Sequence, residues 1–87
     1  MEIILLKQAQ LDIDFWKKSG NKIIQKKIYK LLQNISETPF NGIGKPEALL
    51  HDLSGFWSRR ITDEHRLVYE VETNRIIVYS LKGHYEK

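Results

Sequence analysis

The sequence predicts a small α+β domain, with an antiparallel sheet that carries two helices on one face. Two segments in the first half of the 87-residue chain, 8–19 and 22–36, have apolar residues at helical spacing. Three segments in the second half, 56–62, 65–71 and 75–81, have the short period-two or continuous apolar patterns of strands. With one further strand at the N-terminus, the expected order is β-α-α-β-β-β, which is typical of an α+β domain.

The first strand and the first helix are expected within the first 19 residues. Met1 to Leu6 ends in four consecutive aliphatic residues, which predicts a strand that either has neighbouring strands on both sides or is covered by helices. In the helix that follows, Leu11, Phe15 and Trp16 share one face and are expected to pack on the sheet. Two aspartates fall near the expected start of this helix and two lysines near its end, an order that suits the helix dipole.

The second helix, over residues 22–36, has the most regular pattern in the chain. Its apolar positions recur at spacings of 4, 3 and 4: Ile24, Ile28, Leu31 and Ile35. Lys22, Lys26 and Lys30 recur every four residues and predict a lysine stripe, with Lys27 beside it. Such a stripe is either a solvated helix face or a surface that helps to hold a phosphate backbone, and the pattern leaves both open.

A long irregular connection follows from residue 37 to residue 55 and contains both prolines and three glycines. Connections of this length in a small domain are more often functional than not. Glu47 and His51 lie inside it. A single helical turn over residues 46–50 would place these two side chains, four positions apart, on one face.

The strands over 56–62 and 65–71 are expected to form a hairpin with Asp63 and Glu64 as a two-residue turn. This register pairs Arg59 with Val68 and places Arg59 and Arg66 on the open face of the sheet, with Arg60 on the opposite face. It also turns a set of residues toward the helices: Leu67, Tyr69 and Val71. A second turn over residues 72–74 leads to the last strand.

Composition and charge exclude several classes of protein. The chain has no cysteine, which excludes disulfides, a thiolate nucleophile and cysteine-based metal sites. Its three histidines are scattered and lack ligand spacing, so neither a metal nor a cofactor is expected. No apolar run approaches the ~20 residues of a membrane span, and from the first residues we expect no secretory signal. We expect one domain spanning 1–87, in the cytoplasm and away from membranes. The net charge of +3 favours a polyanionic partner without naming one.

Groups that move protons or bind phosphate are concentrated in residues 45–66. This segment contains Glu47, His51, Arg59, Arg60, His65 and Arg66. The third histidine, His84, stands beside Tyr85 near the C-terminus. We expect the fold to bring this C-terminal pair back to the segment. For His51 and His65 a structural role, through hydrogen bonds to the backbone, is the alternative to a role in a site.

Four ordered motifs, GKPE, LSGFWSRRI, EHRLVY and the terminal HY pair, closely resemble the YoeB (Txe) toxins, mRNA interferases of the RelE/ParE superfamily. The resemblance covers nearly the whole chain and implies a RelE-like, microbial-RNase-like fold. It implies a cytoplasmic toxin of a type II toxin-antitoxin system that cuts mRNA in the ribosomal A site. Its implied partners are mRNA, the ribosome and a YefM-type antitoxin, and a homodimer is left open.

The resemblance also implies roles for individual residues. Glu47 corresponds to the general base, Arg66 to the phosphate-stabilising cation and His84 to the general acid, while Tyr85 completes the site. Three further residues are expected to contact RNA: Lys45, His51 and Arg59. The chain departs from the family pattern in having Leu50 where relatives often have lysine, and in extending past the tyrosine by Glu86 and Lys87.

A base, an acid and a cation are sufficient to cut RNA without a metal, because the 2′-hydroxyl is an internal nucleophile. The expected products are a 2′,3′-cyclic phosphate and a 5′-hydroxyl. Two other classes stay open: an inhibitor that binds the ribosome or a nucleic acid without cleavage, and a ParE-like gyrase inhibitor. Trp57 is expected either to pack in the protein or to stack on a base.

Overall fold

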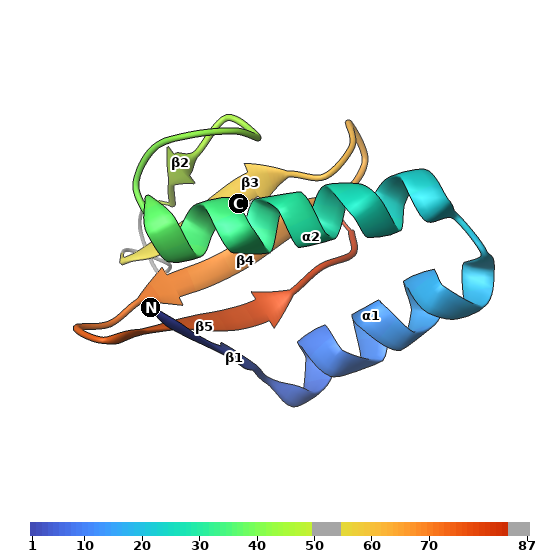
Figure 1. Ribbon diagram of the computed structural model, residues 1–87, viewed down its shortest axis with the longest axis horizontal. Coiled ribbons are helices and arrows are strands. Elements are labelled where there is room, and N and C mark those ends of the chain that lie inside the picture. Colours follow the sequence, from blue (N-terminus) through green and yellow to red (C-terminus); the bar gives the residue numbers. More distant parts are fainter. Residues whose placement is uncertain (50–54, 84–87) are drawn as a thin grey trace.

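The computed structural model describes residues 1–49 and 55–83, which form two helices on one face of a sheet (Figure 1). Its elements are β1 (Glu2–Leu5), α1 (Lys7–Ser19), α2 (Lys22–Glu37), β2 (Glu47–Ala48), β3 (Phe56–Arg60), β4 (Arg66–Val71) and β5 (Arg75–Ser80). The strands form one sheet in the order β1-β5-β4-β3-β2. The predicted α+β class is confirmed.

The sheet differs from the prediction at its two edges. At one edge, β1 runs parallel to β5, so the sheet is mixed and not purely antiparallel. At the other edge, Glu47 and Ala48 form β2 and pair with β3, where the sequence predicted a helical turn. The N–H of Leu49 donates to the carbonyl of Phe56 at 2.9 Å and continues this pairing. The helical turn was wrong because a neighbouring strand satisfies these backbone groups.

Helix α1 buries Trp16 as predicted, but the other two residues of the predicted face are exposed. Its buried residues are Ala9, Asp12 and Trp16, whereas Leu11 and Phe15 are 52% and 46% exposed. The helix begins at Lys7 and has no acid in its first turn, so the expected contribution of the aspartates to the dipole was also wrong. Asp12 lies mid-helix because its carboxylate accepts a hydrogen bond from the distant Leu81 N–H at 2.8 Å.

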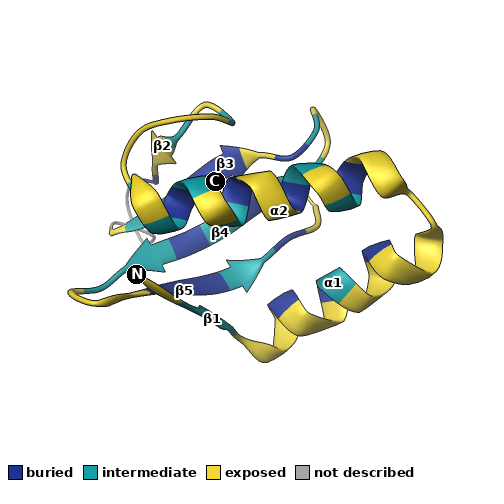
Figure 2. Ribbon diagram, viewed as in Figure 1, coloured by how far each residue is buried: buried dark blue, intermediate teal, exposed yellow. Residues whose placement is uncertain are grey.

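Helix α2 follows the predicted pattern closely. The side chain of Asn21 caps its start by accepting a hydrogen bond from the Ile24 N–H at 3.1 Å. The four predicted apolar positions are all buried, and Figure 2 shows buried residues recurring along the helix between exposed ones. Lys22, Lys26 and Lys30 are exposed, as a lysine stripe requires.

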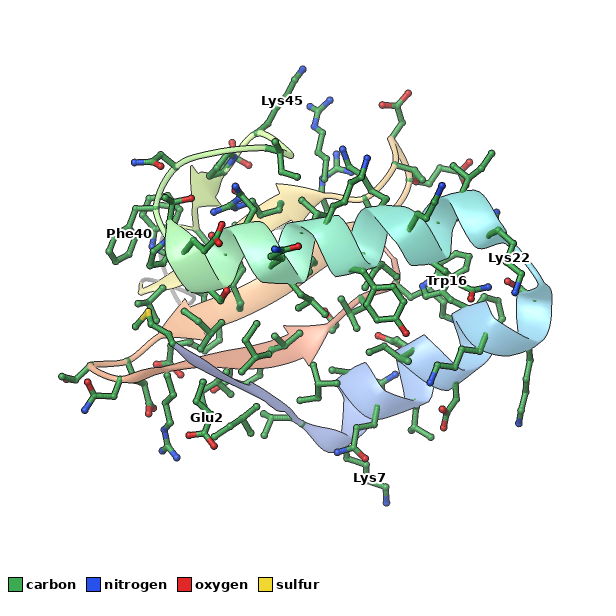
Figure 3. The ribbon with its side chains drawn as sticks, viewed as in Figure 1. Glu2, Lys7, Trp16, Lys22, Phe40 and Lys45 are labelled. Atoms are coloured by element: carbon green, nitrogen blue, oxygen red, sulfur yellow. The ribbon has the colours of Figure 1, made fainter. Side chains whose placement is uncertain are left out.

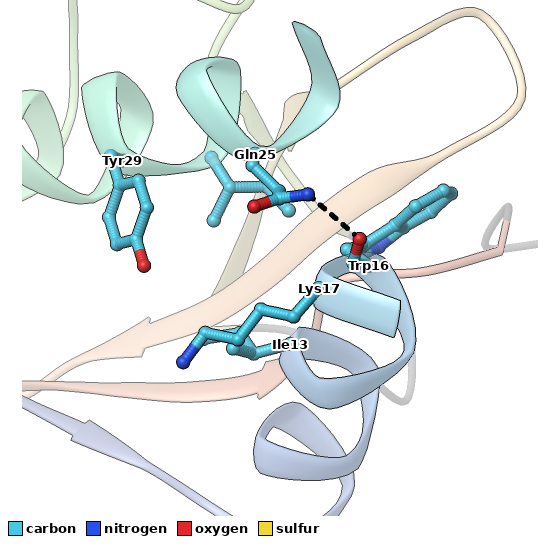
Figure 4. A pocket seen from close by; sticks show the side chains of 6 residues that line it. Ile13, Trp16, Lys17, Gln25 and Tyr29 are labelled. Carbon is cyan, nitrogen blue, oxygen red and sulfur yellow. Dashed lines mark hydrogen bonds between the residues drawn. The ribbon is translucent and has the colours of Figure 1, made fainter. Parts of the chain in front are cut away.

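The core lies between the helices and the sheet. Its buried residues include Trp16, Ile28, Leu31, Ile35, Leu67, Tyr69, Ile76 and Val78. At the junction of the two helices, Gln25 Nε2 donates to the Trp16 carbonyl at 3.0 Å, which ties α2 to the end of α1 (Figure 4). Within the described residues, no helix is long and apolar enough to cross a membrane.

Candidate functional site

The pairing of β3 with β4 decides which arginines reach the open face of the sheet. Arg60 lies opposite Arg66, and Arg59 lies opposite Leu67. The Ile61 N–H donates to the His65 carbonyl at 2.9 Å, so the turn consists of residues 62–64 and is one residue longer than predicted. A one-residue slip exchanges the two faces of a strand. Arg60 therefore joins Arg66 on the open face.

Arg59 points the other way, into the protein, and its predicted place on the open face is wrong. Its exposed fraction is 0%. A guanidinium has five N–H groups, and here each has a protein acceptor. The acceptors are the Tyr69 hydroxyl at 3.1 Å, Asn34 Oδ1 at 2.5 Å, and the carbonyls of Ile43, Thr38 and Asn41 at 3.0, 2.6 and 3.0 Å. No donor is left for a phosphate, so we withdraw the expected RNA contact.

The Tyr69 hydroxyl extends this arrangement by donating to the Pro39 carbonyl at 2.6 Å. Burial raises the pKa of Tyr69 above its ordinary value, and the hydrogen bond and charge of Arg59 partly oppose that rise. We call Arg59, Tyr69 and Asn34 the Arg59 anchor. Three side chains from β3, β4 and α2 thus hold the backbone of residues 38–43 in place.

The next residues attach the connection to the end of β3. Gly44 has φ of 81°, and its carbonyl accepts a hydrogen bond from the Arg60 N–H at 2.7 Å. Lys45 has φ of 51°, which is uncommon for a residue with a side chain. Such a conformation costs about 1–2 kcal/mol and persists only where the surroundings impose it. The pinned backbone then enters β2, which carries Glu47.

Glu47 lies on the same face as the paired arginines. It is opposite Ser58, which in turn is opposite Val68 on β4. Side chains directly opposite each other on neighbouring strands share a face of the sheet. Residues two positions apart on one strand also share a face. Ser58 and Arg60 are two apart on β3, so Glu47, Arg60 and Arg66 all belong to the open face. Glu47 itself is exposed to solvent.

The Arg66 side chain folds over the preceding turn. Its Nη1 donates to the carbonyls of Thr62, Asp63 and His65 at 2.7, 3.1 and 3.2 Å. These bonds fix the guanidinium at the end of the hairpin, beside the end of β3.

The chain beyond β5 returns to Arg66. The Arg66 N–H donates to the Gly83 carbonyl at 2.9 Å, and the Gly83 N–H donates to His65 Nδ1 at 2.9 Å. The His65 ring also meets the edge of Trp16 at a centroid distance of 4.8 Å. The structural interpretation of His65 is therefore confirmed: it holds the residue that precedes His84.

Trp57 lies half-buried on the helix side of β3 and packs against the core. The centroid of its ring is 5.2 Å from the centroid of the Phe40 ring. This position supports packing over base stacking. Trp57 and Arg59 are two apart and must share a face, and this parity was the sequence signal that Arg59 points inward and Arg60 outward. Arg60 was predicted on the wrong face because a two-residue turn was assumed.

Several predicted site residues lie outside the described part of the chain: His51, His84 and Tyr85, as do Leu50, Glu86 and Lys87. Of the predicted residues that are described, Glu47 and Arg66 share the open face of the sheet, Lys45 lies near Arg60, and Arg59 is excluded from that face. Within residues 1–49 and 55–83, no group of three histidine or acidic side chains is arranged to hold a metal ion.

The fold places the chain in a broad class of small bacterial toxins. YafQ from Escherichia coli, only 14% identical, matches it with a TM-score of 0.79 over 95% of this chain and 92% of YafQ, which shows the fold alone. A YoeB/ParE toxin from Agrobacterium tumefaciens matches with a TM-score of 0.93 at 40% identity, over 98% of this chain and all of that one. A YoeB dimer from Staphylococcus aureus matches with a TM-score of 0.88 at 43% identity, over 98% of each chain.

Sequence comparison narrows the class. Toxin YoeB from Escherichia coli K12 is 45% identical over 85 residues, which cover 98% of this chain and all of that toxin. Toxin YoeB from Streptomyces coelicolor is 41% identical with the same coverage. The family model described as the YoeB-like toxin of bacterial type II toxin-antitoxin systems matches residues 6–85. The chain belongs to this family.

Proposed function

We propose that this toxin is a metal-independent endoribonuclease that cuts mRNA in the ribosomal A site. The observation that carries the proposal is that Glu47, Arg60 and Arg66 share the open face of the sheet. A carboxylate on the same sheet face as two guanidinium groups supplies a base and a charge-stabilising pair for phosphodiester chemistry. No cofactor enters the reaction.

In the proposed reaction, the exposed Glu47 carboxylate takes the proton of the 2′-hydroxyl. The 2′-oxygen attacks the adjacent phosphorus, and the P–O5′ bond breaks. His84 gives a proton to the leaving 5′-oxygen, while Arg66, assisted by Arg60, stabilises the negative charge that develops on the phosphate. The products are a 2′,3′-cyclic phosphate and a 5′-hydroxyl.

The position of Gly83 supports the part given to His84. Gly83 immediately precedes His84, and its backbone is hydrogen-bonded to Arg66 and His65. The chain therefore arrives at position 84 from beside the proposed phosphate-binding arginine. Tyr85 helps to place the substrate, and Lys45 and His51 contact the RNA beside it.

The site lies on an open sheet face, so we expect the ribosome to orient the mRNA against it. Holding the reacting groups in line supplies much of the acceleration in such reactions. We further propose a YefM-type antitoxin as the partner, because similar structures from Staphylococcus aureus are described as YoeB–YefM complexes, one of them heterotetrameric. We expect the free toxin to form a homodimer, as the YoeB from that organism does. These partners imply action in the cytoplasm.

The test is mRNA cleavage in a reconstituted translation system, with 5′ ends mapped for wild type and Glu47→Gln. The matched control is Glu64→Gln, which removes an exposed carboxylate from the turn. We expect cuts within A-site codons that Glu47→Gln weakens and Glu64→Gln leaves unchanged. His84→Gln should lower cleavage by ~10²–10⁴-fold, the usual contribution of one acid or base.

Two outcomes would contradict the proposed ribonuclease activity. Translation arrest with intact mRNA would indicate an inhibitor that binds without cutting. If neither arrest nor cleavage occurred, inhibition of gyrase supercoiling would be the next measurement.

A further inference from the structure

A cleft of about 340 Å³ opens beside the candidate site, between α2, the segment at residues 44–45 and the turn after β3. Three cations line it, Lys27, Lys45 and Arg60, together with one carboxylate, Asp63. The three cations come from three separate parts of the fold, so the cleft is a product of tertiary structure. The other residues that line it are uncharged, and none is aromatic.

The backbone fixes how the cleft is assembled. The Arg60 N–H is bonded to the Gly44 carbonyl, which holds the end of β3 against the residue before Lys45. Lys45 keeps its left-handed backbone at φ of 51° within this arrangement. The Arg59 anchor fixes residues 38–43 immediately upstream. Lys45 is thus presented by an ordered backbone, and Figure 3 shows its side chain extending outward.

The charge of the cleft is not balanced by the protein. Three cations and one carboxylate leave a net charge of +2. Asp63 Oδ1 lies 4.0 Å from Arg60 Nη1, and the Asp63 side chain is fully exposed. Exposed pairs of this kind are worth little and exchange readily for another anion. In the described part of the chain, neither Lys27 nor Lys45 takes part in an ion pair.

We propose that this cleft binds a backbone phosphate of RNA that neighbours the phosphate to be cut; the inference rests on the proposed function. Arg60 lines the cleft and is also the cross-strand partner of Arg66, so it connects the two positions. The cleft recognises phosphate and not base, since its lining offers cations but no aromatic ring for stacking.

This assignment separates Lys27 from the lysine stripe beside it. Lys27 is half-buried and lines the cleft, whereas Lys22, Lys26 and Lys30 are exposed and do not line it. Lys22 lies at the far end of α2, well away from Lys45 (Figure 3). The phosphate contact therefore belongs to Lys27, and Lys22 provides a control with the same change of charge on the same helix.

The experiment measures binding of a short, fully 2′-O-methylated RNA, which cannot be cut, by fluorescence anisotropy between about 50 and 200 mM salt. Lys27→Gln and Lys45→Gln should each weaken binding several-fold and reduce the slope of log K against log salt by ~0.7, the value for one phosphate contact on a single strand. Lys22→Gln should leave the slope as in wild type. Thermal unfolding of each variant checks that the fold is retained.

Asp63→Asn provides a change in the opposite direction. Removing the carboxylate that competes with phosphate for Arg60 should tighten binding by ~2- to 5-fold, about the weight of one exposed ion pair. Asp14→Asn removes an exposed carboxylate on α1, outside the cleft, and should not alter binding. DNA of the same sequence should show the same losses in the lysine variants, because the cleft contacts phosphates.

Three results would contradict phosphate binding in the cleft. They are no measurable RNA binding by wild type at low salt, equal effects of Lys27→Gln and Lys22→Gln, or a loss of affinity in the lysine variants for RNA but not for DNA. The two proposals fail separately. Absence of A-site cleavage by wild type would refute the ribonuclease whatever the salt slopes are. Unchanged slopes alongside cleavage that Glu47→Gln abolishes would refute the cleft alone.

Discussion

The Nε–H of Arg59 donates to the hydroxyl of Tyr69 at 3.1 Å, joining neighbouring strands inside the protein. The guanidinium carbon also lies 5.8 Å from the centroid of the Tyr69 ring. Among the described residues, no carboxylate pairs with this buried cation; its acceptors are carbonyls, an amide oxygen and the hydroxyl. The conformation of the connection between α2 and β2 therefore depends on one arginine of the sheet.

Arg59→Met is expected to lower the free energy of unfolding by about 3–5 kcal/mol, since it leaves several buried acceptors unsatisfied. Arg60→Met, one residue later, should change it by less than about 1 kcal/mol because Arg60 is exposed. Denaturant unfolding of both variants measures the difference. RNA affinity should show the opposite ranking: Arg60→Met should weaken RNA binding more than Arg59→Met does. Equal destabilisation by the two variants would contradict the observed strand register.

The raised pKa of Tyr69 predicts a loss of stability at alkaline pH. Burial makes the folded state hold the phenolic proton at a pH where the unfolded state, with a pKa of about 10, releases it. The contribution to stability is therefore complete below about pH 10 and is lost as pH rises through the folded pKa.

Tyr69→Phe should be less stable at neutral pH by about 1–2 kcal/mol, because the Pro39 carbonyl and Arg59 lose a partner. Above pH 10, however, its stability should fall less steeply than that of wild type. Burial and a hydrogen bond to Glu70 also raise the pKa of Tyr79, so some decline will remain. Urea unfolding across alkaline pH tests this, and identical slopes for wild type and variant would count against it. Tyr29→Phe, on an exposed position, is the control.

The elements that sequence predicted well are those with local causes. Helix α2 combines a regular apolar stripe with the capping residue Asn21 immediately before it, and both signals are local in the sequence. The motifs brought Glu47 and Arg66 to attention without any knowledge of the fold. The strands of the second half were likewise found from their own alternation.

The errors came from partners that are distant in the sequence. Asp12 is buried because Leu81, 69 positions away, supplies a donor, and nothing near Asp12 signals this. β2 exists because β3 offers it an edge. Alternation shows that Arg59 and Arg60 face opposite ways, but the length of the turn decides which of them faces inward. The assumed two-residue turn put Arg59 on the open face, whereas the observed turn of residues 62–64 puts Arg60 there.

Gly44→Ala should be more damaging than Gly20→Ala, although both glycines have a positive φ, of 81° and 73°. A Cβ at Gly44 would lie 2.7 Å from Leu31 Cδ2 and 3.2 Å from the Arg60 carbonyl, whereas one at Gly20 would meet nothing within 4 Å. The strain of the left-handed backbone costs about 1 kcal/mol at either position, so the difference measures packing.

We expect a loss of about 2–4 kcal/mol for Gly44→Ala and about 1 kcal/mol for Gly20→Ala in denaturant unfolding. RNA cleavage should also fall in Gly44→Ala, since this residue fixes the approach to Lys45 and Glu47. Similar losses in stability for the two variants would show that Leu31 gives way easily and that the contact does not constrain the loop.

Asp12 and Trp16 of α1 together hold Leu81, two residues before Gly83. The Asp12 carboxylate accepts from the Leu81 N–H at 2.8 Å, and Trp16 Nε1–H donates to the Leu81 carbonyl at 2.9 Å. Asp12→Ala leaves this buried N–H without its acceptor and should cost about 2–3 kcal/mol. Asp12→Asn keeps an oxygen in place and should cost about 1 kcal/mol.

The hydrogen bond between Asp12 and Leu81 fixes the chain that leads to His84. Its loss should therefore increase local opening at Leu81 more than it lowers the global free energy of unfolding. Hydrogen exchange of the Leu81 amide should accelerate by ~10- to 100-fold in Asp12→Ala, since each 1.4 kcal/mol of local opening is worth tenfold. If the proposed ribonuclease activity is correct, cleavage should fall in parallel, because the described chain up to Gly83 is then held less firmly beside Arg66. Asp14→Ala, exposed on the same helix, should change neither quantity. Unaltered exchange at Leu81 in Asp12→Ala would mean that Trp16 and the sheet suffice to position the C-terminal segment.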